Sequence, residues 1–447
     1  MLGIRVNGGV RMRKQITAMA LSLALSGSLL SATALAAETP SGTADAAMAA
    51  AGVKDGQTVT QKELYAADPE GTVSFANLET RVRENNLTVR MLEESIASID
   101  VVDYEKMYDD LKDALNSIAK TQRAMLQLGQ LDSAMGNTSL SGSFSSEYIF
   151  SSLDASYDSL RDTFDDLKDG KIQDDYAAAK RQLENAENQV VMGAETLYMA
   201  ILEMQNTRSS LQRQLDALDR TVEEMELRYK LGQISALTLQ QVKDGRTQMS
   251  SGISTLDMNI RNYTRQLEVM LGLEQAGSLT LTEPPQVSDK LVAEMDYDTA
   301  LAAAKEKSYD LFAAQRTLDD AQETYKDSIK GYGQNNYHYK SAVHTYEAAK
   351  YTYQSTVQSF EMNFRAMYDA VADYQQVLKA SQSALDYQKN AYAASQLKYQ
   401  QGSISKNALL EAQDSLASAE ADVSTAKHNL FSAYHTYLWA VEYGILN

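Results

Sequence analysis

The side chains that could carry metal or acid–base chemistry are few and poorly spaced for it. The chain has four histidines and no cysteine. His428 and His435 are seven residues apart, about 10 Å along a helix, which is too far for one metal ion, and His338 and His344 lie in or beside a presumed turn. We find no nucleophile elbow, HExxH motif, catalytic triad or phosphate loop in the sequence. We therefore expect a protein that is not an enzyme, with no catalytic residue, no metal site and no cofactor.

The clearest pattern is a short break that occurs twice. The sequences LRYKLGQIS and LKYQQGSIS are centred on Gly232 and Gly402. Glycine accepts the left-handed conformation that ends many helices, and serine often caps the start of the next one. We therefore predict that each glycine ends one helix and that Ser235 and Ser405 begin another.

Long helices with a heptad repeat flank both breaks. After the second break, large residues recur every seven positions from Leu409 to Tyr437, and alanines follow them by three, from Ala412 to Ala440. The same register recurs after the first break, where only Arg246 departs from it. Such a seam is typical of a coiled coil, and alanine in it allows close helix packing. The pattern predicts a mainly all-α fold of two tandem long helical hairpins joined by short turns.

The N-terminal segment is typical of an exported protein. A basic start, an apolar run and the sequence ALA predict a signal peptide over residues 1–36. Its removal leaves 37 basic and 60 acidic residues, a net charge of −23, which disfavours nucleic acid as a partner. After the signal, no apolar run approaches the ~20 residues of a membrane-spanning helix.

The repeats suggest a division of the chain into five segments. The sequence from Phe75 to Val89 pairs with that from Tyr297 to Leu311, and Pro284–Pro285 marks a linker between the copies. We predict a signal peptide (1–36), a flexible N-terminal arm (37–72), a first repeat (73–272), an inter-repeat linker (273–294) and a second repeat (295–447).

The first repeat is longer than the second, and the additional residues fall between about Glu94 and Leu183. Within them, the Ser/Gly-rich sequence Gly136–Ser152 is expected to be a short strand or a loop. The matching region of the second repeat, Ile329–Lys340, is expected to be a turn rich in tyrosine and asparagine.

These features together resemble the TolC family of outer membrane efflux proteins. The resemblance rests on the signal peptide, the two repeats, and the Tyr-x-x-Gly-x-x-Ser turn before an alanine-rich heptad helix, best seen in Tyr399–Leu438. It covers about Phe75 to Leu446. The resemblance implies a homotrimer whose hairpins form a hollow α-barrel. The family also has paired strands that build a β-barrel, and the shortage of suitable strands here suggests little or none of it.

The resemblance also implies functional residues near the breaks. The family's gate carboxylates map to Ala408 and Glu411, and only Glu411 keeps the charge. Asp414, one helical turn on, and Tyr399, which matches the family tyrosine, complete the predicted channel entrance. The turns are the expected contact with a periplasmic adaptor, through two sets of residues: Leu231, Gly232, Gln233 and Ile234, and Gln401, Gly402, Ser403 and Ile404. The carboxylates are alternatively part of a solvated face of an acidic protein.

Two functions fit these observations. In the first, the protein is a passive export duct in the outer membrane or cell envelope, working with an adaptor and an inner-membrane pump, and its distal end contacts a membrane. In the second, it is a structural or adhesive coiled-coil protein of the envelope without a through-channel. Acidic residues opposite the alanine seam favour the duct, because a water-filled tunnel needs a polar face.

Overall fold

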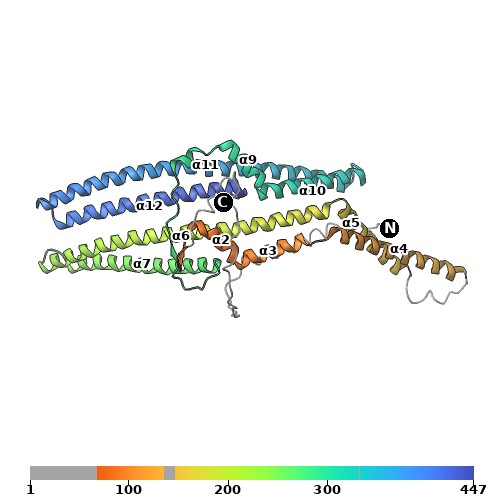
Figure 1. Cartoon of the computed structure of the whole chain (residues 1–447), viewed down its shortest axis with the longest axis horizontal. Coiled ribbons are helices and arrows are strands. Elements are labelled where there is room, and N and C mark those ends of the chain that lie inside the picture. Colours follow the sequence, from red (N-terminus) through yellow and green to blue (C-terminus); the bar gives the residue numbers. More distant parts are fainter. Residues whose placement is uncertain (1–67, 135–145, 332, 447) are drawn as a thin grey trace, which may run out of the picture. The chain divides into compact units, whose positions relative to one another are not determined.

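The computed structural model describes residues 68–134, 146–331 and 333–446 (Figure 1). The predicted signal peptide and residues 37–67 of the predicted arm lie outside the described residues. Residues 68–72, at the end of the predicted arm, make defined contacts. Asp68 accepts hydrogen bonds from the backbone of Ser74 and the side chain of Asn77, both at 3.0 Å, and lies 3.6 Å from Arg81.

Helices make up nearly all of the described chain, so the prediction of a mainly helical fold is confirmed. Two strands, β1 (Thr72–Val73) and β2 (Thr280–Leu281), pair in parallel. The helices are α2 (Phe75–Asn85), α3 (Leu87–Asp100), α4 (Tyr104–Ala134), α5 (Ser146–Lys168), α6 (Lys171–Lys230), α7 (Ala236–Met270), α8 (Asp289–Ala293), α9 (Tyr297–Lys307), α10 (Tyr309–Gly331), α11 (Tyr337–Gln400) and α12 (Lys406–Tyr443).

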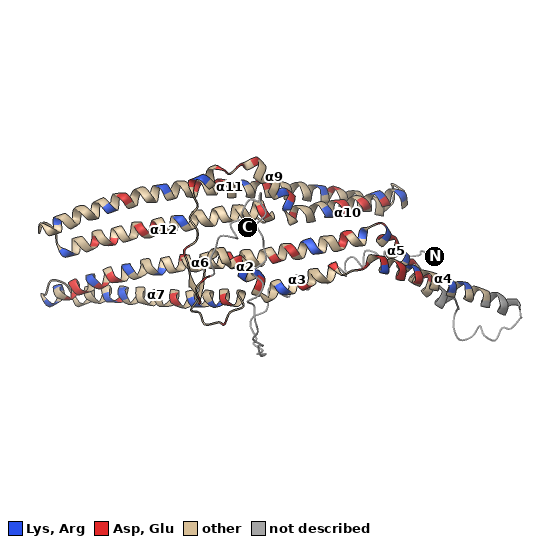
Figure 2. Ribbon diagram, viewed as in Figure 1, with Lys and Arg blue, Asp and Glu red and all other residues tan. Residues whose placement is uncertain are grey.

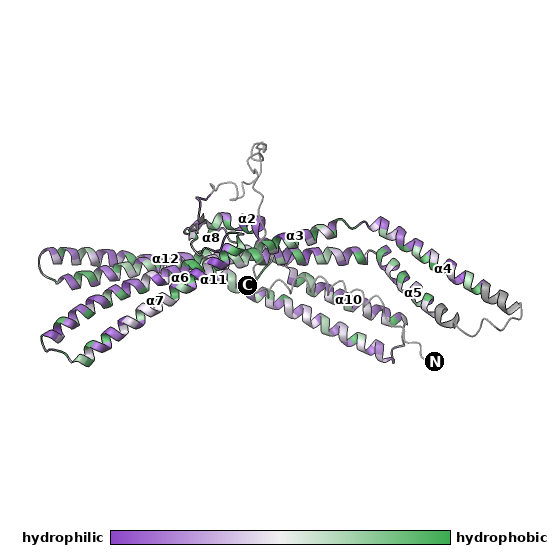
Figure 3. Cartoon of the chain, turned by 90° about the horizontal axis from the view of Figure 1, so that it is seen from below, coloured by the Kyte–Doolittle hydropathy of each residue, from purple (hydrophilic) through white to green (hydrophobic). Residues whose placement is uncertain are grey.

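The chain divides into two compact units. In its described part, the first unit contains residues 91–134 and 146–187, and the second contains residues 68–90, 188–331 and 333–446. The second unit holds the hairpin that residues 188–230 of α6 form with α7, and the hairpin of α11 and α12, as the sequence predicts. Hydrophilic and hydrophobic residues alternate along these helices, as Figure 3 shows. This alternation is expected for helices that bury one stripe.

Most of the heptad seam in the C-terminal half of α12 is buried. Val423, Leu430 and Tyr437 are at most 7% exposed, and so are the alanines that follow them at Ala426 and Ala440. In the first hairpin, Arg246 occupies the position that breaks the apolar pattern. Its side chain pairs with Asp219 of α6 at 2.5 Å, so an ion pair between the two helices replaces an apolar contact at that level.

Tyr198 of α6 connects the small sheet to the helices. Its side chain is fully buried, and its hydroxyl lies 3.0 Å from the carbonyl oxygen of Val73 and 2.7 Å from that of Thr282. The same hydroxyl accepts a hydrogen bond from the Thr282 backbone N–H at 3.0 Å. Because Val73 belongs to β1 and Thr282 follows β2, this one side chain joins the start of the first repeat to the linker.

The first unit contains a second kind of hairpin, made of α4 and α5. Tyr108 and Phe164 pack across it with ring centroids 4.7 Å apart. The expectation of a strand or loop over Gly136–Ser152 is wrong from Ser146 onward, where α5 begins, and residues 136–145 lie outside the described residues. The helix is explained by the three- and four-residue spacing of the half-buried and buried side chains of Leu153, Tyr157, Leu160, Phe164 and Leu167.

The distal turn of the second repeat is shorter than the sequence suggested. Helix α10 continues to Gly331 and α11 begins at Tyr337, so most of Ile329–Lys340 is helical. The side chain of Asn336 caps α11 by accepting a hydrogen bond from the His338 backbone N–H at 2.9 Å. An asparagine read as a turn residue is therefore a helix start.

Candidate functional site

The two predicted breaks have the same geometry. Gly232 and Gly402 both have φ of +71°. In the first turn, the N–H of Gly232 donates to the carbonyl oxygen of Tyr229 at 2.9 Å and that of Gln233 to Arg228 at 2.8 Å. The second turn repeats both bonds at the same distances. This paired pattern is the Schellman motif, which satisfies the last carbonyl groups of a helix.

Serine begins the outgoing helix of each hairpin, as predicted. The Ser235 hydroxyl accepts from the Thr238 backbone N–H at 3.1 Å, and the Ser405 hydroxyl accepts from Ala408 at the same distance. The turns are therefore compact, because each one ends a helix and starts the next within a few residues.

Both turns present side chains to solvent. Leu231 is 64% exposed, and Gly232, Gln233, Gln401, Gly402 and Ser403 are also exposed. Ile234 and Ile404 are half-buried. The predicted contact residues are thus brought together in two equivalent turns, and within each turn the isoleucine is the least accessible member.

The predicted gate residues differ in their surroundings. Glu411 is exposed, and Tyr399 is 40% exposed in the last turn of α11. Asp414 is half-buried, and its carboxylate pairs with the guanidinium of Arg220 on α6. Of the two predicted carboxylates, Asp414 therefore has its charge balanced within the chain, through a partner that sequence reasoning did not identify.

A ladder of polar contacts joins α6 of the first hairpin to α12 of the second. It runs from Glu195 with Trp439, through Asn206 with Ser424, to Arg220 with Asp414. From the Glu195–Trp439 contact to the Arg220–Asp414 contact, the residue number rises along α6 by as much as it falls along α12. The two helices are therefore antiparallel. The C-terminal end of α6 lies beside the N-terminal end of α12, which places both glycine turns at the same end of the second unit (Figure 1).

His428 of α12 contacts both α6 and the inter-repeat linker. Its imidazole is 5% exposed, with Nδ1 3.2 Å from the side-chain nitrogen of Asn206 and Nε2 2.5 Å from the carboxylate of Glu283. The amide N–H of Asn206 donates to Nδ1, so the ring proton is on Nε2 and is donated to Glu283. One histidine thus holds α6, α12 and the linker together, a role that its spacing in the sequence could not indicate.

A buried acid–base pair lies farther along the same helices. The Glu195 carboxylate accepts a hydrogen bond from the single tryptophan, Trp439, at 2.5 Å, and lies 3.5 Å from Nδ1 of His435. Burial raises the pKa of Glu195 to about 8, although the Trp439 hydrogen bond opposes the rise. Burial likewise lowers the pKa of His435 to about 4. Both groups therefore prefer their uncharged forms near neutral pH.

The charged residues elsewhere on the hairpins are mixed in sign. Figure 2 shows acidic and basic residues interspersed along α6, α7, α11 and α12. Arg208 with Asp257 and Lys243 with Glu226 form ion pairs between α6 and α7, at 2.5 and 2.7 Å. Both pairs are partly exposed, so they contribute little to stability and mainly fix how the helices align.

Two kinds of site do not occur in the described part of the chain. None of its helices has both the length and the apolar composition required to cross a membrane. Within residues 68–134, 146–331 and 333–446, no three metal-ligating side chains lie together in a way that could hold an ion.

Comparison with known proteins shows what part of the chain is similar to. Residues 328–436, which include α11 and most of α12, match the model of a family described as outer membrane efflux protein. No curated protein matches the sequence. Solved structures with a similar fold include the Campylobacter jejuni CmeC outer membrane channel, at 14% identity and a TM-score of 0.47 over 64% of this chain and 68% of that one.

Two further structures show the same likeness. The Vibrio cholerae outer membrane protein VceC is 16% identical, with a TM-score of 0.41 over 61% of this chain and 76% of that one. The open state of the Neisseria gonorrhoeae MtrE outer membrane channel is 13% identical, with a TM-score of 0.45 over 83% of this chain and 89% of that one.

The family match covers residues 328–436, which are thus similar in sequence to outer membrane efflux proteins. This efflux-protein family is similar to the TolC family that the duplicated turns and heptad helices resemble.

Proposed function

We propose that the protein is the duct of an export system: a homotrimer in the cell envelope, working with a periplasmic adaptor and an inner-membrane pump. The family match supports an efflux channel. The observation that carries the proposal is the α6–α12 ladder, because it aligns two hairpins side by side with both turns at one end. Aligned hairpins are the repeating unit from which a helical cylinder can be closed by symmetry.

The turns are the proposed contact for the adaptor. They expose a leucine, two glutamines and a serine at two equivalent positions, and they hold Ile234 and Ile404 half-buried beside them. A half-buried apolar residue under a polar rim gains free energy when a partner covers it. The rigid Schellman turns would present this surface with little loss of conformational entropy on binding.

Glu411 is the proposed charged group of the channel entrance. It is exposed, whereas Asp414 is already paired with Arg220. In a trimer, three copies of Glu411 around one axis would form a carboxylate ring that attracts cations. Asp414 would instead hold the two hairpins together near the entrance, and Tyr399 would contribute to the entrance from the end of α11.

Electron microscopy of the purified protein tests the proposal. A hollow trimer supports the duct, whereas a monomer or a solid bundle contradicts it and favours the structural coiled-coil protein. The adaptor contact is tested separately, with a photo-cross-linking amino acid at Gln233 or Ser403 in the native host. We expect an adaptor protein to be captured from these positions and not from Met362, which is 66% exposed on α11 away from the turns.

A further inference from the structure

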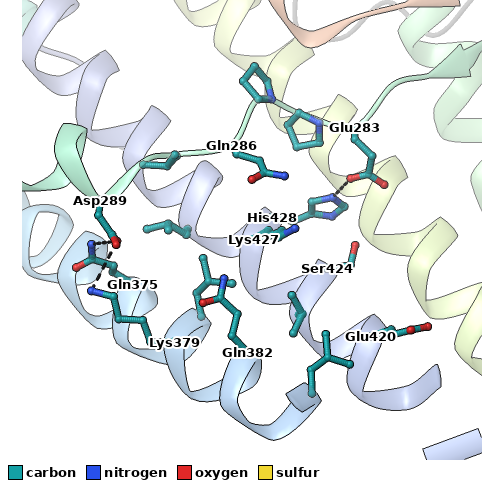
Figure 4. A pocket seen from close by; sticks show the side chains of 17 residues that line it. Glu283, Gln286, Asp289, Gln375, Lys379, Gln382, Glu420, Ser424, Lys427 and His428 are labelled. Atoms are coloured by element: carbon teal, nitrogen blue, oxygen red, sulfur yellow. Dashed lines mark hydrogen bonds and ion pairs between the residues drawn. The ribbon is translucent and has the colours of Figure 1, made fainter. Parts of the chain in front are cut away.

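The inter-repeat linker encloses a cavity that the proposed export function does not use. Residues Glu283–Asp289, here called the strap, cross over α11 and α12 and leave a cavity of about 480 Å³ beneath and beside them (Figure 4). Its volume lies in the range of small-molecule sites, roughly 300–1,000 Å³.

The strap is fixed at both ends. At one end the Glu283 carboxylate accepts the hydrogen bond of His428 at 2.5 Å. At the other, Asp289 accepts a hydrogen bond from Gln375 at 2.6 Å and lies 3.6 Å from the ammonium of Lys379 (Figure 4). The two prolines between these ends limit the conformations of the strap. The cavity is therefore held open by built contacts and not by a loose loop.

The lining has the composition of a ligand site. Leu378 and Leu385 of α11 and Val423 and Leu430 of α12 supply apolar surface. Polar groups surround it, among them the side-chain amides of Gln286 and Gln382. An amide offers both donors and an acceptor, so these two side chains match the alternating N–H and C=O groups of a peptide backbone.

Two oppositely charged side chains line the cavity. Glu420 and Lys427 both belong to α12, and neither side chain forms an ion pair or hydrogen bond with any other described residue. A separation of seven residues puts them on the same helix face, about 10.5 Å apart along the axis. An extended peptide advances about 3.3–3.6 Å per residue, so three residues cover the same distance.

We propose that this cavity binds short zwitterionic peptides of about three residues. The terminal carboxylate pairs with Lys427, the terminal ammonium pairs with Glu420, and the backbone contacts the amides of Gln286 and Gln382. Small apolar side chains of the peptide lie against Leu378 and its apolar neighbours. The site is independent of the export duct, because it involves neither the turns nor the proposed channel entrance.

Calorimetric titration of the purified protein with the tripeptide Ala-Ala-Ala tests the proposal. For a ligand of this size we expect a dissociation constant on the order of 0.2 mM. The blocked peptide N-acetyl-Ala-Ala-Ala-amide has the same backbone without the two charges. It should bind at least roughly tenfold more weakly, because both charge-assisted contacts are lost.

Variants of the two charged residues locate the site. Glu420→Gln and Lys427→Met should each weaken Ala-Ala-Ala binding roughly tenfold. Asp422→Asn is the matched control, because Asp422 is exposed on the same helix and does not line the cavity. The exchange of both charges, Glu420→Lys with Lys427→Glu, should restore binding with the peptide reversed. Circular dichroism verifies that each variant remains helical.

Several results would overturn the proposal. Equal binding of the charged and blocked peptides would show that the two charges are not recognised. Unchanged affinity in both single variants, or failure of the exchanged pair to recover binding, would place the peptide elsewhere. The absence of binding at peptide concentrations about fiftyfold above the expected dissociation constant would mean that the cavity is not a peptide site, including the case in which another copy of the chain covers it.

Discussion

Gly444, just after α12, packs its α-carbon against the backbone of Ser308, where the chain breaks between α9 and α10. Gly272, just after α7, has the same relation to Asn85, whose carbonyl oxygen would lie 3.0 Å from an added Cβ. Both glycines are left-handed, with φ of +68° and +67°. In each repeat, the end of the second hairpin helix therefore closes against the break that follows the first short helix.

The first prediction concerns this close approach. Gly444→Ala should lower the free energy of unfolding by about 3 kcal/mol, from left-handed strain of roughly 1–2 kcal/mol and overlap with the Ser308 backbone. Gly402→Ala is the control, because Gly402 has a similar φ of +71° and nothing within 4 Å of an added Cβ. Gly402→Ala should lower the free energy of unfolding only by the strain of a left-handed alanine. Urea unfolding followed by the fluorescence of Trp439 measures both changes.

Equal losses in the two variants would contradict this explanation. That result would mean that only the backbone conformation requires glycine at position 444, and that the contact with Ser308 relaxes without cost.

The second prediction concerns the pH dependence of stability. Glu195 has a pKa raised to about 8 in the folded protein. Its contribution to the free energy of unfolding is therefore fully present below the unfolded pKa of 4.5 and is lost as pH rises through 8. His435 has a pKa lowered to about 4, so its contribution is present above 6.5 and lost as pH falls. The two slopes oppose each other between pH 4.5 and 6.5. Stability should therefore be nearly level there and should fall above 6.5.

Glu195→Gln tests this profile. The glutamine can still accept the hydrogen bond of Trp439, but it does not titrate. Between pH 6.5 and 8 the native protein should lose on the order of 2 kcal/mol, and the variant should not. The charges of Glu79, Arg83 and Glu442 also affect the pKa of Glu195, so the variant keeps these three residues. Glu203→Gln, on the same helix α6, is the control. A persistent alkaline loss in the Glu195 variant would assign the titration to another group.

The third prediction concerns the hydroxyl of Tyr198. Tyr198→Phe removes the group that accepts from the Thr282 backbone N–H and donates to a backbone carbonyl oxygen. Buried backbone groups would lose their hydrogen-bond partner, so the free energy of unfolding should fall by about 1–3 kcal/mol. Tyr387→Phe, at a side chain 70% exposed, should have no measurable effect. Hydrogen exchange at Thr282 should also speed up in Tyr198→Phe, and unchanged exchange there would disprove the proposed link.

The fourth prediction distinguishes the two carboxylates proposed for the channel entrance, Glu411 and Asp414. If Glu411 forms the cation-binding ring, Glu411→Gln should weaken Mg²⁺ binding to the oligomer at least roughly tenfold, because each subunit loses one charge. Asp414→Asn should change it by less than about twofold, since Asp414 already pairs with Arg220. Calorimetric titration with Mg²⁺ measures both. A larger effect of Asp414→Asn would assign the ring to that residue instead.

The hairpins and their turns could be predicted from the amino-acid sequence alone. The signals are local in the chain: a glycine at the end of each incoming helix, a serine that caps the start of the outgoing helix, and apolar residues spaced by seven. Because they involve only neighbouring residues, they can be recognised without the tertiary structure. The sequence was less informative about Gly136–Ser152, where serine and glycine suggested a strand or loop although α5 begins at Ser146. The apolar spacing that follows favours the helix there.

The partners of the polar side chains depend on the tertiary fold. Asp414 with Arg220, Glu195 with Trp439, and His428 with Glu283 join residues far apart in the chain. Nothing in the spacing of such residues shows that they meet, because their contact depends on how one hairpin aligns with the other. The strands β1 and β2 have two residues each, too short for any alternating pattern, and exist because Tyr198 and the fold bring them together. The strap cavity likewise arises from the path of the linker over α11 and α12.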